Sequence, residues 1–253
     1  AVAALFTDCR AGLRAVHNRR QTLETRPMYY EPGVTPHGLP HDPFKSCVIP
    51  RPIGWISTVD RQGRHNLAPF SQFQNVTFDP PIVMFSANQT SAGERKDSVR
   101  NAEDTGEFVW NMATWDQREA VNLSAEELPH GVDEFERAGL VKAPSVRVKP
   151  PRVAGSPIQF ECVYLNTLRF PGPPPMGTAD VVFGRVVAVH IADEALTPDG
   201  LVDVLKIKPI ARMGYYDYTW VDKRFEMVIP GNSQALLAGL EGSADKVRAA
   251  EHS

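Results

Sequence analysis

The sequence predicts a mainly β fold, an antiparallel barrel with a few peripheral helices, and three observations lead to this prediction. Strand-like runs of β-branched and aromatic residues are separated by loops rather than by helices of crossover length. Two of these runs flank a short turn and predict a hairpin. The helical segments are few and short. The expected strands cover residues 48–59, 64–70, 82–87, 107–112, 158–170 and 179–191, and the expected helices cover residues 98–104, 115–127 and 133–138.

The predicted hairpin joins residues 48–59 to residues 64–70 through Asp60-Arg61-Gln62-Gly63. A glycine at the last turn position suits a backbone with positive φ. Pro69 lies inside the returning strand and has no N–H for a ladder hydrogen bond, so that strand is expected at a sheet edge or a bulge. Later in the chain, residues 171–175 contain four prolines and predict a rigid loop between two strands.

Composition excludes several classes of protein. The chain has 253 residues, 42% of them hydrophobic, which is enough to bury a substantial core. Its apolar runs, at residues 81–85 and 181–189, are too short for a membrane helix. The net charge of −3 and the lack of a basic stripe argue against nucleic acid as a partner.

The three cysteines, Cys9, Cys47 and Cys162, are too few and too widely spaced for a disulfide framework or a zinc site. A reducing cytoplasm is the expected location. Cys162 lies in a strand-like run and is expected to be a buried, inert thiol. Prolines beside His37 and His41 exclude the helical spacing that would aim both at one metal.

We expect three parts: an N-terminal extension with an extended arm rich in proline and glycine (residues 1–44), one barrel domain (45–230) and a C-terminal tail (231–253). The first 27 residues hold five arginines and two acidic residues. We interpret them as an extension before a natural start at Met28, in preference to an organelle transit peptide. Residues 1–18 could form a short helix.

Polar residues gather on the two strands of the hairpin. Ser57 and Thr58 end the first strand, and Asn66, Phe70 and Ser71 lie on the second. Their hydroxyls and backbone N–H groups could converge on a ligand. Taken alone, the pattern also suits an ordinary hairpin with polar residues facing water.

A second candidate is an anion site. Ser86 and Asn88 end a strand, and Lys96-Asp97-Ser98 precedes a helix for which Asp97 or Ser98 is the expected N-cap. Free N–H groups at a helix start, with a lysine beside them, suit a phosphate. By itself the motif also fits a capped surface helix with an incidental lysine.

These motifs occur together in an order that resembles the flavin reductase-like, FMN-binding split-barrel family, in its flavoredoxin-like branch. The resemblance covers roughly residues 45–230. The matching residues are Arg51-Pro52-Ile53, Ser57-Thr58, residues 66–71, Pro80-Pro81, Ser86, Lys96-Asp97-Ser98, Asn101, Gly106-Glu107-Phe108-Val109, Glu134-Phe135, Ala138-Gly139-Leu140, Pro150-Pro151, Glu161-Cys162, Gly184-Arg185-Val186 and Ala211-Arg212-Met213-Gly214.

The resemblance implies a homodimeric split β-barrel that binds FMN and acts as an NAD(P)H:flavin oxidoreductase, with a free flavin, a partner oxygenase or another acceptor receiving the electrons. No side chain is nominated as catalytic, because the flavin supplies the reactivity. The sequence has no G-x-G-x-x-G after a strand, so a nicotinamide would bind transiently over the flavin. The expected cofactor-binding residues are Arg51, Ser57, Thr58, Asn66, Phe70, Ser71, Ser86, Asn88, Lys96, Asp97 and Ser98.

Two other functions remain open: an FMN-binding electron carrier or storage protein without turnover, and a barrel adapted to heme or a pyridoxal compound. Many family members have Gly-Gly where this chain has residues 214–220, with the aromatics Tyr215, Tyr216, Tyr218 and Trp220. This cluster is expected either at a core or subunit interface, which is the preferred interpretation, or against a ligand ring. The carrier function would gain support if Tyr216, Tyr218 or the loop at residues 171–176 blocked the flavin face.

Overall fold

The computed structural model describes residues 28–227. The chain forms two compact units, and the boundary between them in the sequence lies between Pro43 and Phe44. In the first unit, residues 28–43 form an arm without regular helix or strand, in which Val34 and Thr35 donate their N–H groups to the carbonyl of Glu31. An extended, turn-rich arm is what its prolines and glycines predict. The segments expected as an N-terminal extension (1–27) and a C-terminal tail (231–253) lie outside the described residues.

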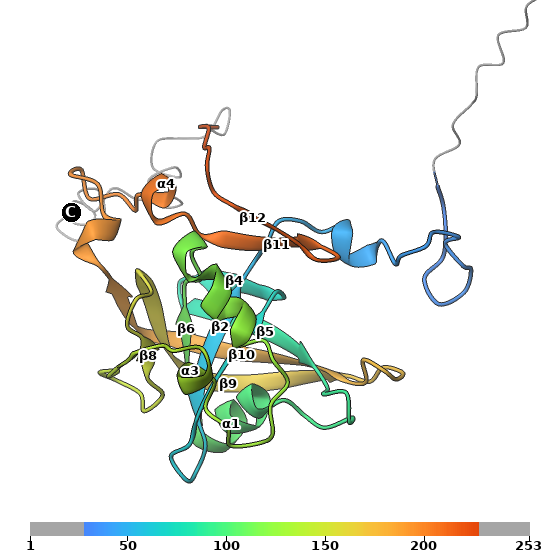
Figure 1. The fold of residues 1–253 in the computed structure, drawn as a ribbon, viewed down its shortest axis with the longest axis horizontal. Coiled ribbons are helices and arrows are strands. Elements are labelled where there is room, and N and C mark those ends of the chain that lie inside the picture. The colour runs from blue at the N-terminus through green and yellow to red at the C-terminus, as the bar shows by residue number, and fades with distance from the viewer. Residues whose placement is uncertain (1–27, 228–253) are drawn as a thin grey trace, which may run out of the picture. The chain divides into compact units, whose positions relative to one another are not determined.

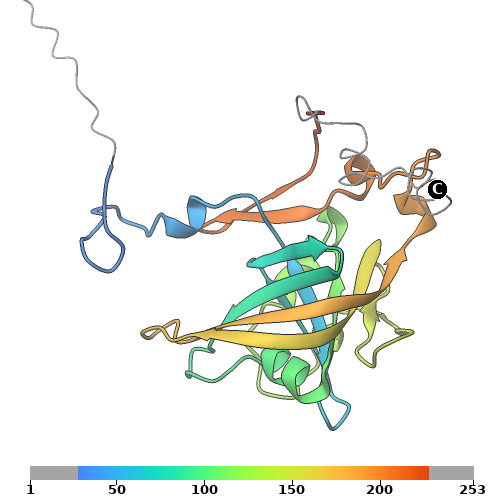
Figure 2. The same ribbon diagram turned by 180° about the vertical axis from the view of Figure 1, so that it is seen from behind.

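The second unit, over residues 44–227, contains a seven-stranded sheet in which every neighbouring pair is antiparallel (Figure 1). Figure 2 shows the two longest strands, β9 and β10, running side by side. In spatial order the strands are β3 (His65–Phe70), β2 (Gly54–Val59), β6 (Glu107–Asn111), β9 (Ile158–Phe170), β10 (Ala179–Ile191), β5 (Pro81–Asn88) and β4 (Phe73–Phe78). The predicted antiparallel arrangement is therefore confirmed.

Two smaller sheets accompany the main one: β1 (Arg51–Pro52) with β11 (Ile210–Gly214) and β12 (Asp217–Trp220), and β7 (Lys142–Ala143) with β8 (Arg152–Val153). The helices are short, as predicted. They are η1 (Phe44–Ser46), α1 (Asp97–Thr105), η2 (Trp115–Gln117), α2 (Arg118–Leu123), α3 (Glu134–Arg137), η3 (Asp193–Ala195) and α4 (Val204–Ile207). No helix within residues 28–227 is long and apolar enough to cross a bilayer.

Two predicted elements need correction. The run 48–59 is not one strand, because β1 pairs with β11 while β2 belongs to the main sheet. The helix expected over residues 115–127 is shorter and begins as the 3-10 turn η2. Strand β4 was not predicted, since its burial pattern shows one buried residue, Phe73, among mostly exposed ones and gives no clear alternation.

Strand β2 is buried on both faces, because a separate hydrophobic cluster packs against each of them. Its Ile56 packs into one core cluster with Phe85, Phe108 and Trp110, whereas its neighbour Trp55 packs into a second cluster. Successive side chains of a strand point to opposite faces, so the two clusters lie on opposite sides of the sheet. This placement fixes the hairpin rigidly from both sides.

The hairpin has the predicted turn. The N–H of Gly63 donates to the carbonyl of Asp60 at 3.1 Å, and Gly63 has a φ of +82°. Strand β3 is the terminal strand of the main sheet, as Pro69 requires. The N–H of Leu67 points away from β2 and donates to Glu134, so the nitrogen of Pro69, two residues on, also lies on the free edge.

Candidate functional site

A cavity of about 470 Å³ lies along the free edge of β3. Its walls come from three segments that are far apart in sequence: strand β3, the loop that leads into α1 together with the start of that helix, and residues 124–134. Five of the predicted site residues line it, namely Asn66, Phe70, Lys96, Asp97 and Ser98. The structure therefore joins the hairpin candidate and the anion candidate into one site.

The start of α1 forms the polar end of this cavity. The N-cap is Lys96, one residue earlier than predicted, and no side chain caps the helix. Val99 and Arg100 donate their N–H groups to the carbonyl of Lys96. Among the described residues the N–H groups of Asp97 and Ser98 find no acceptor, as is usual for the first turn of a helix. Together with the Lys96 ammonium, they make this end attractive to an anion.

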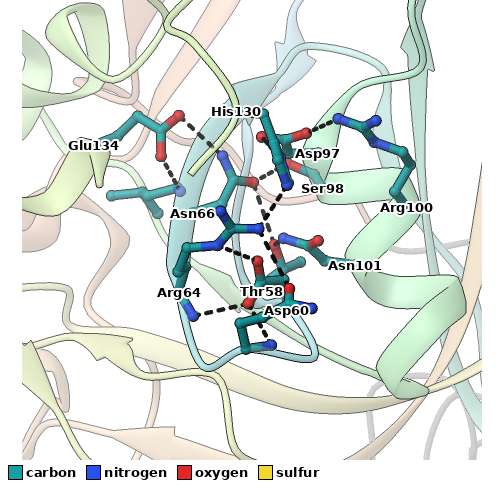
Figure 3. A network of polar contacts seen from close by, with 12 residues as sticks. Thr58, Asp60, Arg64, Asn66, Asp97, Ser98, Arg100, Asn101, His130 and Glu134 are labelled. Atoms are coloured by element: carbon teal, nitrogen blue, oxygen red, sulfur yellow. Dashed lines mark hydrogen bonds and ion pairs between the residues drawn. The ribbon is translucent and has the colours of Figure 1, made fainter. Parts of the chain in front are cut away.

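Asn66 is the centre of a buried polar network that ties β3 to α1 (Figure 3). Its Oδ1 accepts hydrogen bonds from Ser98 Oγ at 2.7 Å and Thr58 Oγ1 at 3.2 Å. Asn101 Nδ2 in turn donates to Thr58 Oγ1 at 3.0 Å. Thr58 does not line the cavity, but through its hydrogen bond it orients Asn66, which does.

The other end of the Asn66 amide is held by Glu134. Asn66 Nδ2 donates to Glu134 Oε1 at 3.0 Å, and the N–H of Leu67 donates to Oε2 at 2.9 Å. Burial raises the pKa of the Glu134 carboxyl, and these two donors only partly counter that effect. Glu134 was not predicted as a site residue, although it belongs to a motif of the family resemblance. Its signal was visible in the sequence as an acidic residue next to the buried Phe135.

A second chain of contacts closes the cavity on the side of Asp97. His130 Nδ1 lies 2.9 Å from Asp97 Oδ2, and its Nε2 lies 2.8 Å from Arg64 Nη2 (Figure 3). Since the guanidinium can only donate, Nε2 is the acceptor in the contact with Arg64, and Nδ1 then donates to the Asp97 carboxylate. Burial acts to raise the pKa of Asp97, but contacts with Arg100 and His130 outweigh it and lower the pKa.

The structure places the remaining predicted residues outside the lining of the cavity. Ser57 is fully buried on the other face of β2, where its hydroxyl donates to the carbonyl of Pro151 at 2.5 Å. The Arg51 guanidinium donates to carbonyls of Val48 at 2.8 Å and Met213 at 3.2 Å. Ser71, Ser86 and Asn88 are half-buried around β4 and β5. The hydroxyls of Ser57 and Thr58 thus do not converge, because adjacent strand residues face opposite sides, and contact of Ser57 with a cofactor stays a prediction.

Three aromatics of the cluster at residues 214–220 line a different cavity, of about 270 Å³, with Trp115 and Arg118; they are Tyr216, Tyr218 and Trp220. Trp115 and Trp220 pack at 4.4 Å between ring centroids, and Arg118 lies 4.3 Å above the Trp115 ring. Tyr216 is 94% exposed, so it does not belong to the core of this chain. A subunit interface or a ligand contact for this cluster stays a prediction.

The predicted state of Cys162 is confirmed. Its side chain is fully buried within β9, and burial raises the pKa of the thiol far above its usual range. Cys47 is exposed, and Cys9 lies outside the described residues. Among residues 28–227 no group of three or more histidines, cysteines and carboxylates is arranged to hold a metal ion.

Comparison with known proteins agrees with this geometry. Residues 46–219 match the family model described as "Flavin reductase like domain". A solved Shewanella frigidimarina protein with a split barrel domain shares the fold at 22% identity and a TM-score of 0.64, covering 74% of this chain and 89% of that one. The molecule is therefore a split barrel.

Two further solved structures are similar in sequence as well as fold. Component B of nitrilotriacetate monooxygenase from Bacillus cereus is 32% identical with a TM-score of 0.68, over 73% of this chain and 90% of that one. The 2-nitrobenzoate 2-nitroreductase of Pseudomonas fluorescens is 26% identical with a TM-score of 0.65, over 74% and 89%. The chain belongs to the flavin reductase-like family.

Proposed function

We propose that this protein is an FMN-dependent oxidoreductase that acts as an NAD(P)H:flavin reductase. The observation that carries the proposal is the cavity beside β3, which has anion donors at one end and the free edge of a rigid strand along its wall. Its volume of about 470 Å³ is within the range of small-molecule and cofactor sites.

The residues present fit the parts of FMN. Lys96 and the N–H groups that open α1 would hold the phosphate, because they combine a point charge with unsatisfied donors. Ala68, Pro69 and Phe70 on β3 would contact the ring system. Ser98 and Asn66 are fixed by their mutual hydrogen bond, so this wall is preorganised before any ligand arrives.

Bound FMN would supply hydride acceptance and electron transfer. The protein's own groups would bind and orient it. Glu134 and His130 both make hydrogen bonds that hold the walls of the cavity, and no side chain is assigned as acid, base or nucleophile. A nicotinamide would then reach the flavin from solvent.

One observation favours the reductase over an FMN-binding carrier. The segments that could block access, Tyr216, Tyr218 and residues 171–176, do not line the cavity within the described part of one chain. The flavin-reductase proposal requires such access, and a carrier does not. The similar B. cereus protein is component B of a monooxygenase and the P. fluorescens protein is a nitroreductase, which supports a partner oxygenase or a small aromatic acceptor for this chain.

We also propose that the protein forms a homodimer, as the family resemblance implies. Large apolar side chains are exposed on the main sheet, and a second subunit could cover them. They include Val76 and Phe78 on β4, Leu165, Leu168 and Phe170 on β9, and Val189 and Ile191 on β10. Light scattering on the purified protein would give twice the 28.0 kDa chain mass for a dimer, and a single chain mass would reject it.

The experiment that tests the function is an absorbance spectrum of the protein with FMN, followed by anaerobic addition of NADH and, separately, NADPH. Loss of the long-wavelength flavin band would support the reductase and identify the donor. Binding of FMN without bleaching by either donor would favour the carrier. Absence of FMN binding would reject the assignment.

A further inference from the structure

The carboxylate of Glu127 occupies the polar end of the cavity. Its Oε1 accepts from Ser91 Oγ at 2.5 Å and from the N–H of Ser91 at 3.1 Å, and its Oε2 lies 2.9 Å from Lys96 Nζ. These donors come from the loop before α1, whereas Glu127 comes from the segment after α2. The contact therefore joins two of the three segments that form the cavity.

The donors around Glu127 include the lysine that the proposed function assigns to the flavin phosphate. Hydrogen bonds from Ser91 and Lys96 lower the pKa of the Glu127 carboxyl to about 2, so this group is charged at neutral pH. The Glu127 carboxylate accepts hydrogen bonds from a hydroxyl, a backbone N–H and an ammonium. A phosphate needs donors of the same kind.

We propose that Glu127 is a built-in competitor for the anion site: its carboxylate must leave Lys96 and Ser91 before a flavin phosphate can bind there. This inference rests on the proposed function, because it concerns the same site. It assigns Glu127 a role in ligand selection. A phosphate dianion displaces the carboxylate from Lys96, whereas a flavin without a phosphate has nothing with which to displace it.

The energetics suit a contact that is made and broken. The side chains of Lys96 and Glu127 are 33% and 41% exposed, and an ion pair with that exposure contributes only about 0–1 kcal/mol. A phosphate carries a charge of about −1.5 to −2 at neutral pH and gains more from the same lysine. Glu134, which is buried and holds the strand, lacks this freedom.

The neighbouring residue provides a matched control. Glu126 lines the same cavity, but its Oε2 lies 2.9 Å from Arg137 Nε and does not contact Lys96 or Ser91. Glu126→Gln and Glu127→Gln therefore remove the same charge from adjacent positions. Only Glu127→Gln removes a negative charge that contacts Lys96 and Ser91.

The test is a fluorescence titration of the flavin-free protein and both variants with FMN and, separately, riboflavin. Glu127→Gln is expected to tighten FMN binding by about 3- to 5-fold with riboflavin unchanged, because the amide cannot hold Lys96 as the carboxylate does. Glu126→Gln should change either affinity by less than about twofold. Glu127→Ala, which removes the side chain altogether, should tighten FMN binding in the same direction.

Three results would overturn the inference while leaving the proposed function intact: FMN affinity unchanged or weakened in Glu127→Gln, an equal gain for riboflavin, or an equal gain in Glu126→Gln. If neither the parent chain nor any variant bound FMN, the proposed function would fail and the inference with it. Circular dichroism of each variant separates loss of the fold from loss of the site.

Discussion

The hydroxyl of Ser98, in the first turn of α1, donates a 2.7 Å hydrogen bond to the side-chain carbonyl of Asn66 on β3. The two residues are 32 positions apart in sequence, and this contact brings the anion end of the cavity against the strand that forms its wall. Asn66 also accepts from Thr58 on β2 and donates to Glu134 on α3, so a single buried amide connects β3 to three other elements.

We expect Asn66→Ala to destabilise the fold by about 1–3 kcal/mol, because it leaves the Ser98 hydroxyl and the Glu134 carboxylate without a buried partner. Urea denaturation of parent and variant measures this difference. Asn75→Ala, at an exposed position of β4, is the control and should change the free energy of unfolding by less than about 0.5 kcal/mol. If Asn66→Ala and Asn75→Ala were equally stable, the Asn66 network would contribute nothing to the free energy of unfolding.

Glu161 predicts a pH dependence. Its buried carboxylate accepts N–H bonds from Val146, Arg147 and Val148 and lies 2.6 Å from His190 Nε2. Burial acts to raise the pKa of Glu161, but these contacts prevail and lower it below the ordinary value. A carboxyl group with a lowered folded-state pKa stabilises the fold above its unfolded pKa, and this stabilisation is lost as the pH falls through the folded value.

Glu161→Gln is therefore expected to cost about 2–4 kcal/mol near pH 7, since its amide would present N–H groups to donors. The difference from the parent should shrink as the pH falls below about 4.5, because the parent carboxylate becomes protonated there. Denaturation curves of the parent and Glu161→Gln at several pH values measure this difference in the free energy of unfolding. A difference that stayed constant from pH 7 to pH 3 would contradict this account of the Glu161 contacts.

Gly184 on β10 lies at a register shift between β9 and β10, directly against the core. A Cβ there would lie 2.3 Å from atoms of the Phe108 ring, which is fully buried. Gly184→Ala should destabilise the fold by about 1–3 kcal/mol through overpacking. Thermal unfolding followed by circular dichroism would show it, and a variant as stable as the parent would mean that the ring has room to move.

Sequence patterns predicted the elements whose signal is local. Strands β9 and β10 match their predicted bounds. Each is a run of thirteen residues rich in β-branched and aromatic side chains, and such a run favours a strand over its whole length. Strand β4 is mostly exposed, and it is recognisable only once β5 is seen beside it. The separation of β1 from β2 depends likewise on pairing with β11, more than 150 residues later.

The candidate site was predictable in part for the same reason. Asn66, Lys96 and Ser98, which line the cavity, were predicted as cofactor-binding residues because each belongs to a recognisable motif. Glu127 was not predicted, since it lies on an exposed segment and only its contact with Lys96 in the folded chain connects it to the site. Ser57 was placed in the site with Thr58, although the alternation of side chains along a strand allows only one of two neighbours to face it.

The central claim is that the site at the start of α1 holds the phosphate of FMN through Lys96, and a fluorescence titration of Lys96→Ala with FMN and riboflavin tests it most directly. Removal of a charge-assisted contact should weaken FMN binding by about 10- to 100-fold. Riboflavin affinity should not change. Lys149→Ala, at an exposed position outside the cavity, should bind FMN like the parent. FMN affinity unchanged in Lys96→Ala, or an equal loss for riboflavin, would contradict the claim.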